Sequence, residues 1–439
     1  MAQSIVIVGG GVTGLTIADR LLDRGHPVTL LEQSSVVGGL CRSYHYGDFI
    51  FDIGPHRLFS ANPELTRFFE DVLDGACSYI PRNSQVHMEG KYLDWPLSLP
   101  GVLHLPWRYP FRCAADLIRM WRQPDAVITN LEEYITASYG PTIYETFWKG
   151  YTEKFLTIPC RDVDAEWGRV SVGRAVIDRR KEPRGLTDLI KDVCTPHSSR
   201  LKFIYPRNGM GTFCDRLADR IRRRGGRIIT SATIDSVTCS GNSVTSIALA
   251  DGTRVDAGRL VWTGGLPALC RLFKLPPPSV NYLSTILYNV ELDIDLPGTW
   301  QWIYYPSPEC LFSRISLPAR FGPETAPAGR AGLCIEVTCM EDSSTWREAE
   351  QLTDRVIADL VVVNLIDRAN HVKACHIERV PNTYPVYRKG YGTTVQAAHA
   401  MLARFGNLHL AGRQALFSHD NIDEAVENAL QLVAHLPQN

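Results

Sequence analysis

The segment at residues 4–14, SIVIVGGGVTG, most constrains what this chain can fold into. Its apolar residues 5–8 predict a short buried strand, and Gly9, Gly11 and Gly14 follow with the spacing G-x-G-x-x-G. In this spacing the first glycine permits a tight turn, the second lets the backbone approach a pyrophosphate, and the third lets the next helix pack closely on the strand. We therefore expect a dinucleotide-binding βαβ unit at the start of the chain.

The residues that follow complete this unit. Apolar residues at helical spacing predict a helix over 15–24, whose N-terminal N–H groups and positive dipole end would face the phosphates. A second strand is expected over 28–31 and ends at Glu32. This carboxylate can accept hydrogen bonds from a ribose 2′-hydroxyl and would repel a 2′-phosphate, so the unit disfavours NADP.

Two segments after Glu32 distinguish between FAD and NAD. Residues 37–42, VGGLCR, bring two glycines and an arginine close to the expected phosphates, and residues 51–56, FDIGPH, return toward the same site. Glycines let the backbone lie against a cofactor, and a guanidinium can bind phosphate. This order resembles the start of the glutathione-reductase-type flavoproteins, which include amine oxidases, protoporphyrinogen oxidases and UDP-galactopyranose mutases. The resemblance implies that the cofactor is FAD.

Length and composition set further limits. The chain has 439 residues, too many for one hydrophobic core, so two or three domains are expected. The formal net charge of −1 argues against a surface for nucleic acid or anionic membranes. The twelve cysteines are scattered, no signal peptide is evident, no apolar run has membrane-spanning length, and the twelve histidines form no ligand motif. These features favour a cytoplasmic protein with reduced thiols, no membrane span and no metal site.

The expected architecture is α/β. The resemblance implies a Rossmann-like FAD-binding domain of the glutathione-reductase type, an inserted small helical domain and an antiparallel β-sheet substrate domain. We expect the FAD-binding domain to be discontinuous and to comprise residues 1–80, 200–270 and 395–439. The helical domain would comprise residues 97–199, and the substrate domain residues 81–96 and 271–394.

Local patterns predict individual elements within these domains. We expect helices over residues 62–73, 111–122, 130–155 and 424–436, a hairpin over 85–95, and strands over 234–238, 243–249 and 254–262. Asn130 is a suitable N-cap, and Gly140-Pro141 is expected to divide the helix that follows it. The aromatic residues of 300–305 suggest a sheet beside the substrate.

The C-terminal residues are expected to close the cofactor site. A short strand at 408–411 precedes Gly412 and Arg413, and Asn421 can cap the last helix. A helix N-terminus suits partial negative charge on the flavin O2 and N1 atoms. In all, we expect FAD to contact Gly9, Gly11, Thr13, Gly14, Glu32, Gly39, Leu40, Arg42, His56, Ile234, Gly412, Arg413, Asn421, Ile422 and Asp423.

Several segments resemble the bacterial UDP-galactopyranose mutases more than the other branches. They are Lys149–Lys154 (KGYTEK), Gly54-Pro55-His56, Tyr384-Pro385-Val386 and the residues from Gly412 to Asn421. The resemblance implies that Arg174 and Arg314 hold a nucleotide diphosphate, that Tyr151 stacks on the base, and that Tyr384 lies in the substrate site. Two guanidinium groups from different segments can clamp a diphosphate through planar, bidentate contacts.

The resemblance also implies a reaction. Reduced flavin N5 would attack the anomeric carbon of a nucleotide sugar, with a UDP-linked sugar favoured, so that its pyranose and furanose forms interconvert. His56, Arg174 and Arg314 are the expected catalytic residues. FAD would be needed in its reduced form, with NADPH or NADH as an external reductant, and association into a homodimer is compatible with the sequence.

Other residues favour a different chemistry. Residues 158–167, IPCRDVDAEW, resemble protoporphyrinogen-oxidase-like and amine-oxidase-like flavoproteins, and Leu156 replaces a tryptophan of the mutases. The alternative is an FAD-dependent oxidoreductase that removes hydride from an amine, a sugar or a polyene. A protein that binds FAD without catalysis is a third alternative.

Overall fold

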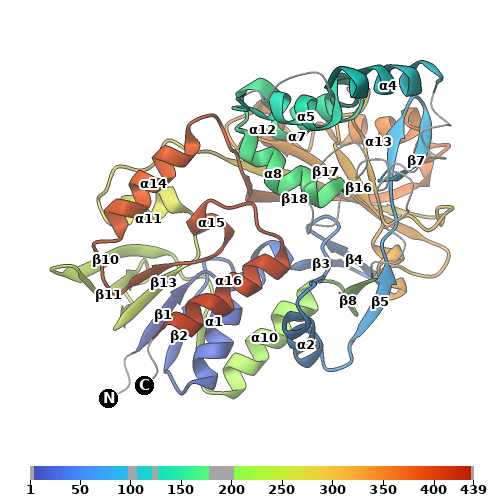
Figure 1. The fold of residues 1–439 in the computed structure, drawn as a ribbon. Helices are drawn as coiled ribbons and strands as arrows, with labels where there is room; N and C mark the ends of the chain where they lie inside the picture. The colour runs from blue at the N-terminus through green and yellow to red at the C-terminus, as the bar shows by residue number, and fades with distance from the viewer. Residues whose placement is uncertain (1–3, 97–105, 121–126, 177–201, 437–439) are drawn as a thin grey trace.

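The computed structural model describes residues 4–96, 106–120, 127–176 and 202–436 (Figure 1). A parallel sheet lies in the lower left of the view, with both chain termini at its edge. A larger sheet lies at the upper right, beneath a layer of helices.

The parallel sheet is the expected dinucleotide-binding sheet. Its strands, in order, are β19 (Leu408–Leu410), β13 (Arg259–Trp262), β1 (Ile5–Val8), β2 (Val28–Leu31) and β9 (Arg227–Ile229). β1 is central and buried on both faces, as its unbroken apolar run predicts. The helices α1 (Val12–Asp23), α10 (Gly211–Arg223) and α16 (Ile422–His435) pack together in the core that covers this sheet. The predicted Rossmann-like fold is confirmed.

One predicted strand in this region is wrong. Residues 254–262 form two short strands, β12 (Arg254–Asp256) and β13, because the chain turns at Ala257 and Gly258. The N–H of Ala257 donates to Thr245, whereas that of Gly258 donates to Ser4. These two bonds lead the chain from a three-stranded antiparallel sheet into the parallel one. The antiparallel sheet consists of β10 (Ile234–Ser240), β11 (Ser243–Leu249) and β12.

The second large sheet has seven strands. In order they are β18 (Val372–Pro385), β14 (Tyr282–Leu292), β17 (Ala331–Cys339), β16 (Arg314–Ser316), β15 (Trp302–Tyr304), β6 (Ser84–Met88) and β7 (Lys91–Trp95). The predicted hairpin is confirmed as β6–β7. The sheet is not purely antiparallel, because β6 pairs with β15 in parallel. This exception arises where an early hairpin joins strands that come some 200 residues later in the chain.

Helices cover the seven-stranded sheet (Figure 1). They include α4 (Arg108–Met120), α5 (Leu131–Tyr139), α7 (Lys149–Leu156) and α8 (Ala165–Val176). The N-cap prediction is confirmed, because the Asn130 side chain and Glu133 form a reciprocal capping box at the start of α5. The helix also ends before Gly140, as predicted. α4 begins three residues before the predicted start, because the Tyr109 N–H already donates to the Pro106 carbonyl.

The structure does not describe residues 97–105, 121–126 and 177–201. All of these except residues 200 and 201 were assigned to the helical domain. Within the described part of the chain, no helix is long and apolar enough to cross a membrane. The same residues contain no group of three His, Cys, Asp or Glu side chains placed to hold a metal ion.

Candidate active site

A cleft of about 820 Å³ extends along the glycine-rich loop at the carboxyl ends of β1 and β2. It runs from Glu32 and Ile234 at one end to His56 and the start of α16 at the other. Of the expected cofactor contacts, it is lined by Gly9, Gly11, Thr13, Glu32, Gly39, Leu40, Arg42, His56, Ile234, Gly412, Arg413, Asn421 and Ile422. Gly14 and Asp423 are not among its lining residues.

The three loop glycines have different roles. A Cβ on Gly9 would lie 2.1 Å from Thr263 Oγ1, and Gly9 also has a φ of +106°. A Cβ on Gly14 would lie 2.0 Å from the carbonyl oxygen of Gly9, so Gly14 serves the packing of α1 on β1. Gly11, the N-cap of α1, has open space at this position and no side-chain cap. The first turn of α1 therefore presents N–H groups to the cleft, where a pyrophosphate would bind.

The acid at the end of β2 is held in a defined orientation. One carboxylate oxygen of Glu32 accepts from the N–H of Gly10 at 2.6 Å, and the other from the N–H of Ser34 at 2.7 Å. Each oxygen retains a lone pair, so the carboxylate can still accept from ribose hydroxyls.

The C-terminal segment closes the other end of the cleft. Asn421 caps α16 in a capping box with Glu424, and Ile422 and Asp423 occupy its first turn. Arg413 has a structural role that the sequence did not indicate. Its guanidinium donates to the carbonyls of Asp420 and Thr383, so it fixes the loop before α16 against β18.

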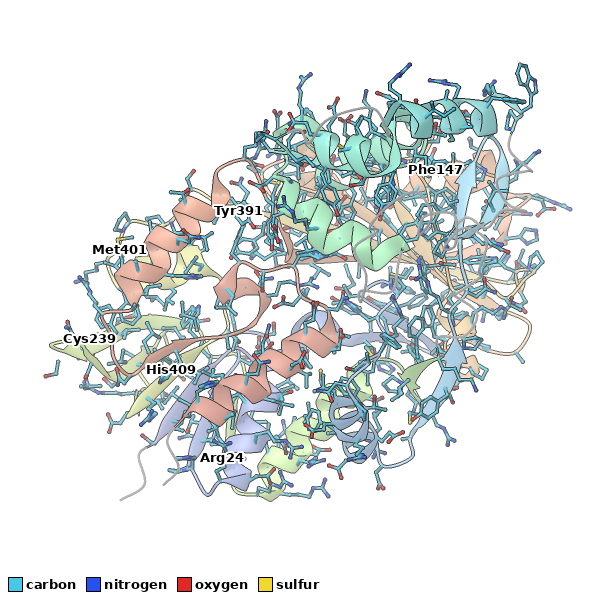
Figure 2. All side chains as sticks on the ribbon, viewed as in Figure 1. Arg24, Phe147, Cys239, Tyr391, Met401 and His409 are labelled. Carbon is cyan, nitrogen blue, oxygen red and sulfur yellow. The ribbon has the colours of Figure 1, made fainter. Side chains whose placement is uncertain are left out.

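A second cavity, of about 240 Å³, adjoins the cleft. The two share His56, Arg413 and Asn421. The wall of the second cavity is aromatic and includes Trp95, Phe147, Trp148, Tyr151, Phe155, Trp167, Tyr304 and Tyr384. Phe147, labelled in Figure 2, comes from the layer of helices and packs against the β6–β7 hairpin. No carboxylate is among the described residues that line this cavity. Its charged groups are guanidinium groups.

Arg314 lies in this cavity, but its bidentate edge is already occupied. Its Nε and Nη2 atoms each lie 2.6 Å from an oxygen of Glu336 on β17, and Nη2 also donates to the Tyr384 hydroxyl at 3.2 Å. Burial alone would lower the pKa of Arg314, but the Glu336 carboxylate outweighs burial and raises it. In this arrangement only the Nη1 edge of Arg314 is left for a ligand, and the expected contact of Arg314 with a diphosphate stays a prediction.

His56 lies where the cleft and the cavity meet. Burial and the positive charges of Arg413, Arg314 and Arg57 lower the pKa of His56 to about 3, so the ring is neutral at physiological pH. Its Nδ1 is shielded from solvent and has no hydrogen-bond partner in the described residues. The turn before His56 requires Gly54, whose φ is +70° and whose Cβ would lie 2.8 Å from a Glu336 oxygen.

Tyr151 and Tyr384 line the same cavity. The Tyr151 ring stacks on Phe155 with 5.8 Å between centroids and meets Tyr304 edge-on at 5.3 Å. Burial raises the pKa of Tyr151 well above its ordinary value, so its hydroxyl is protonated. Arg174 lies in α8, but its side chain is outside the described residues.

The charged residues of the KGYTEK segment stabilise the cavity rather than line it. Lys154 Nζ donates to the carbonyls of Tyr305, Cys310 and Phe312 at 2.9 to 3.2 Å. Glu153 accepts from the N–H of Cys160 at 3.0 Å. The sequence pattern alone did not distinguish these roles from that of Tyr151.

Several cavity residues were not predicted. They are Arg57, Trp95, Trp148, Trp167 and the cavity side of Arg413. Glu336, which pairs with Arg314 but does not line the cavity, was not predicted either. Arg57 directly follows the predicted His56, which was a usable signal. Glu336 had none, since the β16–β17 pairing that opposes it to Arg314 is tertiary.

Comparison with known proteins agrees with this geometry. Residues 7–72 match the family described as NAD(P)-binding Rossmann-like domain. An L-amino-acid oxidase of Sistrurus catenatus edwardsii is 48% identical over an alignment of 480 residues, which covers 98% of this chain and 86% of the oxidase. The chain belongs to the FAD-dependent amine oxidase superfamily, which includes this L-amino-acid oxidase.

Two solved structures share the fold over almost the whole chain. A reduced UDP-galactopyranose mutase superposes with a TM-score of 0.82 at 21% identity and covers 99% of this chain and 95% of the mutase. A putative protoporphyrinogen oxidase from Exiguobacterium sp. superposes with a TM-score of 0.75 at 16% identity, covering 99% and 98%. At these identities the likeness establishes the fold and not the reaction.

The residues of the cleft fit the FAD of this superfamily. The open space at Gly11 and the uncapped start of α1 suit a pyrophosphate, and Glu32 suits a ribose. The start of α16 and His56 lie at the end of the cleft that opens into the aromatic cavity. When bound there, FAD supplies a redox-active ring.

Proposed function

We propose that this chain is an FAD-dependent, mutase-like enzyme that interconverts the pyranose and furanose forms of a nucleotide sugar, UDP-linked in the favoured case. The observation that carries the proposal is the second cavity. It joins the cofactor cleft at His56, brings Tyr151, Arg314 and Tyr384 together, and is cationic and aromatic in its described lining. Such a lining suits an anionic substrate with a planar ring.

Each residue has a role in this proposal. Tyr151 stacks on the base, and the Nη1 edge of Arg314 donates to the diphosphate together with Arg174. Tyr384 positions Arg314 through its hydroxyl. His56 stays neutral and supports both the cofactor and the sugar. The chain would then provide orientation and charge neutralisation rather than a strong acid or base.

The test compares oxidised and dithionite-reduced holoenzyme, supplied with UDP-galactopyranose without oxygen and analysed by chromatography. The proposal expects furanose product only after reduction, with NADPH or NADH able to replace dithionite. The absence of product from the reduced enzyme would refute it. Tyr151→Ala should raise KM at least tenfold and Tyr151→Phe should leave it nearly unchanged, because only the alanine variant loses the stacking ring.

A second candidate is oxidation of an amino acid or a related anionic substrate. It is supported by the 48% identity to an L-amino-acid oxidase and by the guanidinium of Arg57 in the cavity. The same lining disfavours cationic polyamines as substrates, because their positive charge would need a carboxylate in the cavity to pair with. Rapid bleaching of the oxidised, yellow enzyme by L-amino acids under anaerobic conditions would favour this candidate over the mutase.

A further inference from the structure

The guanidinium of Arg42, in the cofactor cleft, is held by a tyrosine from outside the cleft lining. Arg42 is among the described residues that line the cleft, and Tyr44 is not. Nε of Arg42 donates to the Tyr44 hydroxyl oxygen at 3.0 Å, and Nη2 donates to the same oxygen at 2.5 Å. The Cζ of Arg42 also lies 4.9 Å from the centroid of the Tyr44 ring. Tyr44 thus occupies one edge of the guanidinium, and Nη1 at the other end remains for a ligand.

The residues just before Arg42 lie against the glycine-rich loop. The N–H of Gly38 donates to the Gly10 carbonyl at 2.8 Å, and a Cβ on Gly39 would lie 3.1 Å from the Cα of Gly11. Gly11 is the N-cap of α1, where the pyrophosphate is expected. Arg42 therefore enters the cleft at the phosphate position.

Tyr44 orients Arg42 without neutralising it. Burial raises the pKa of Tyr44 above its ordinary value, and the charge of Arg42 lowers it only in part, so the hydroxyl stays protonated. Arg314 shows the opposite arrangement, because its partner Glu336 is a carboxylate that compensates its charge. The neutral hydroxyl of Tyr44 leaves the positive charge of Arg42 available for an anionic ligand.

Tyr44 is itself fixed by packing. It lies on β3 (Ser43–Tyr46), where it pairs with Phe51 of β4 (Phe49–Asp52). Its ring packs against a core cluster that contains Phe51 and Val380. Val380 belongs to β18, at the edge of the seven-stranded sheet. A side chain held between two sheets can keep a bound guanidinium in one orientation.

We propose that Tyr44 is a positioning residue that turns the Nη1 end of Arg42 toward the diphosphate of FAD and leaves the charge of Arg42 intact. The sequence predicts contact of Arg42 with FAD but assigns no role to Tyr44. The inference rests on the proposed function only in taking the cleft as the FAD site, and it does not depend on which reaction the flavin supports. A guanidinium held in advance loses less conformational freedom when phosphate binds to it.

The test is calorimetric titration of the full chain, freed of bound flavin, with FAD and, separately, with ADP. ADP carries the diphosphate without the flavin ring. Tyr44→Phe should weaken the binding of both ligands about tenfold, because it removes the oxygen that accepts from two charged donors. Arg42→Met should weaken both further, because the charge is lost as well.

Tyr46→Phe is the matched control. Tyr46 lies on the same strand, and its hydroxyl donates to Glu378, so this substitution also removes a hydroxyl that is bonded to a charged side chain. Tyr46 is not among the described residues that line the cleft. Tyr46→Phe should bind FAD and ADP as the wild type does.

A double substitution separates positioning from structural support. In an Arg42→Met background, Tyr44→Phe should cause no further loss of affinity, because no guanidinium is left to orient. An equal loss with and without Arg42 would overturn the inference, and so would an unchanged Kd in Tyr44→Phe. If a melting curve shows that Arg42→Met is unfolded, Arg42→Lys takes its place, since lysine has no second nitrogen for the tyrosine to hold.

The two ligands identify the part of FAD that Arg42 meets. Weaker binding of FAD with unchanged binding of ADP would overturn the assignment to the diphosphate. A wild-type chain that binds FAD, with the expected loss in Tyr44→Phe, supports the inference even if it converts no UDP-galactopyranose, a result that refutes the mutase alone. A wild-type chain that binds neither ligand refutes the FAD site and the inference together.

Discussion

At the scale of single residues, the site depends on charges whose partners lie far away in sequence. Arg314 and Glu336 form a buried pair across the β16–β17 ladder, and the Glu336 carboxylate also packs against Gly54, in the turn that precedes His56. One carboxylate thus orients a cavity arginine and shapes the turn beside the cofactor cleft.

Removal of this carboxylate should be destabilising. We expect Glu336→Gln to lower the free energy of unfolding by about 3 kcal/mol, because it leaves the charge of Arg314 buried and unpaired. Chemical denaturation measures the change. Glu350→Gln is the control: its pair with Arg379 is exposed and should contribute little. Equal effects of the two substitutions would contradict the special role of the buried pair.

The neutral state of His56 predicts a pH dependence of stability. Its pKa is about 3 in the folded protein and 6.5 when unperturbed, so between these values the unfolded state binds more protons. Above pH 6.5 this histidine costs the folded state no stability. The free energy of unfolding then falls as the pH drops from 6.5 toward 3, because the unfolded state binds the proton that the buried ring does not. Between pH 7 and pH 5 the loss should be about 2 kcal/mol.

His56→Asn should remove this part of the pH dependence. Denaturation of both proteins at pH 5 and pH 7 gives the comparison. If the difference between the two pH values is the same with and without the histidine, the ring is not held neutral by the fold.

At the scale of elements, the cofactor cleft is formed by two helix N-termini and one tight contact between helix and strand. α1 begins at Gly11 without a side-chain cap, whereas α16 begins at Asn421 with a complete capping box. The start of α1 is thus left open, which is consistent with phosphate binding there. α1 can approach β1 only because Gly14 has no Cβ.

Gly14→Ala tests this contact. Its Cβ would lie 2.0 Å from a backbone oxygen, so α1 has to shift, and overpacking of this kind costs about 1–3 kcal/mol. We expect lower thermal stability and weaker retention of FAD on gel filtration. Gly392→Ala, within α14 (Tyr391–Leu402), has no atom within 4 Å of the added Cβ and should retain both properties.

At the scale of the whole molecule, the candidate active site lies between two sheets. The cofactor cleft comes from the parallel sheet, and most of the aromatic cavity comes from the seven-stranded sheet and the helices above it. We propose that the chain divides into the three domains expected from the sequence, with the reaction at their junction.

FAD should therefore stabilise the whole protein. At a free concentration one hundred times its Kd, the stabilisation expected from mass action is about 2.7 kcal/mol. Thermal unfolding with increasing FAD measures it, and Glu32→Gln should require more FAD for the same shift. A melting temperature independent of FAD would contradict the assignment of the cleft.

Most features of the cofactor cleft could be predicted from local sequence patterns. The glycines, the acid after β2 and the N-cap before α16 are local signals, because each depends on backbone geometry within a few residues. The charge arrangement of the second cavity could not be predicted in this way, because it depends on contacts between distant segments. Sheet pairing set Glu336 against Arg314. The packing of α7 turned Tyr151 into the cavity and Lys154 onto the carbonyls of Tyr305, Cys310 and Phe312. Charge compensation depends on distances in space, and residues far apart in the chain carry no local pattern that records them.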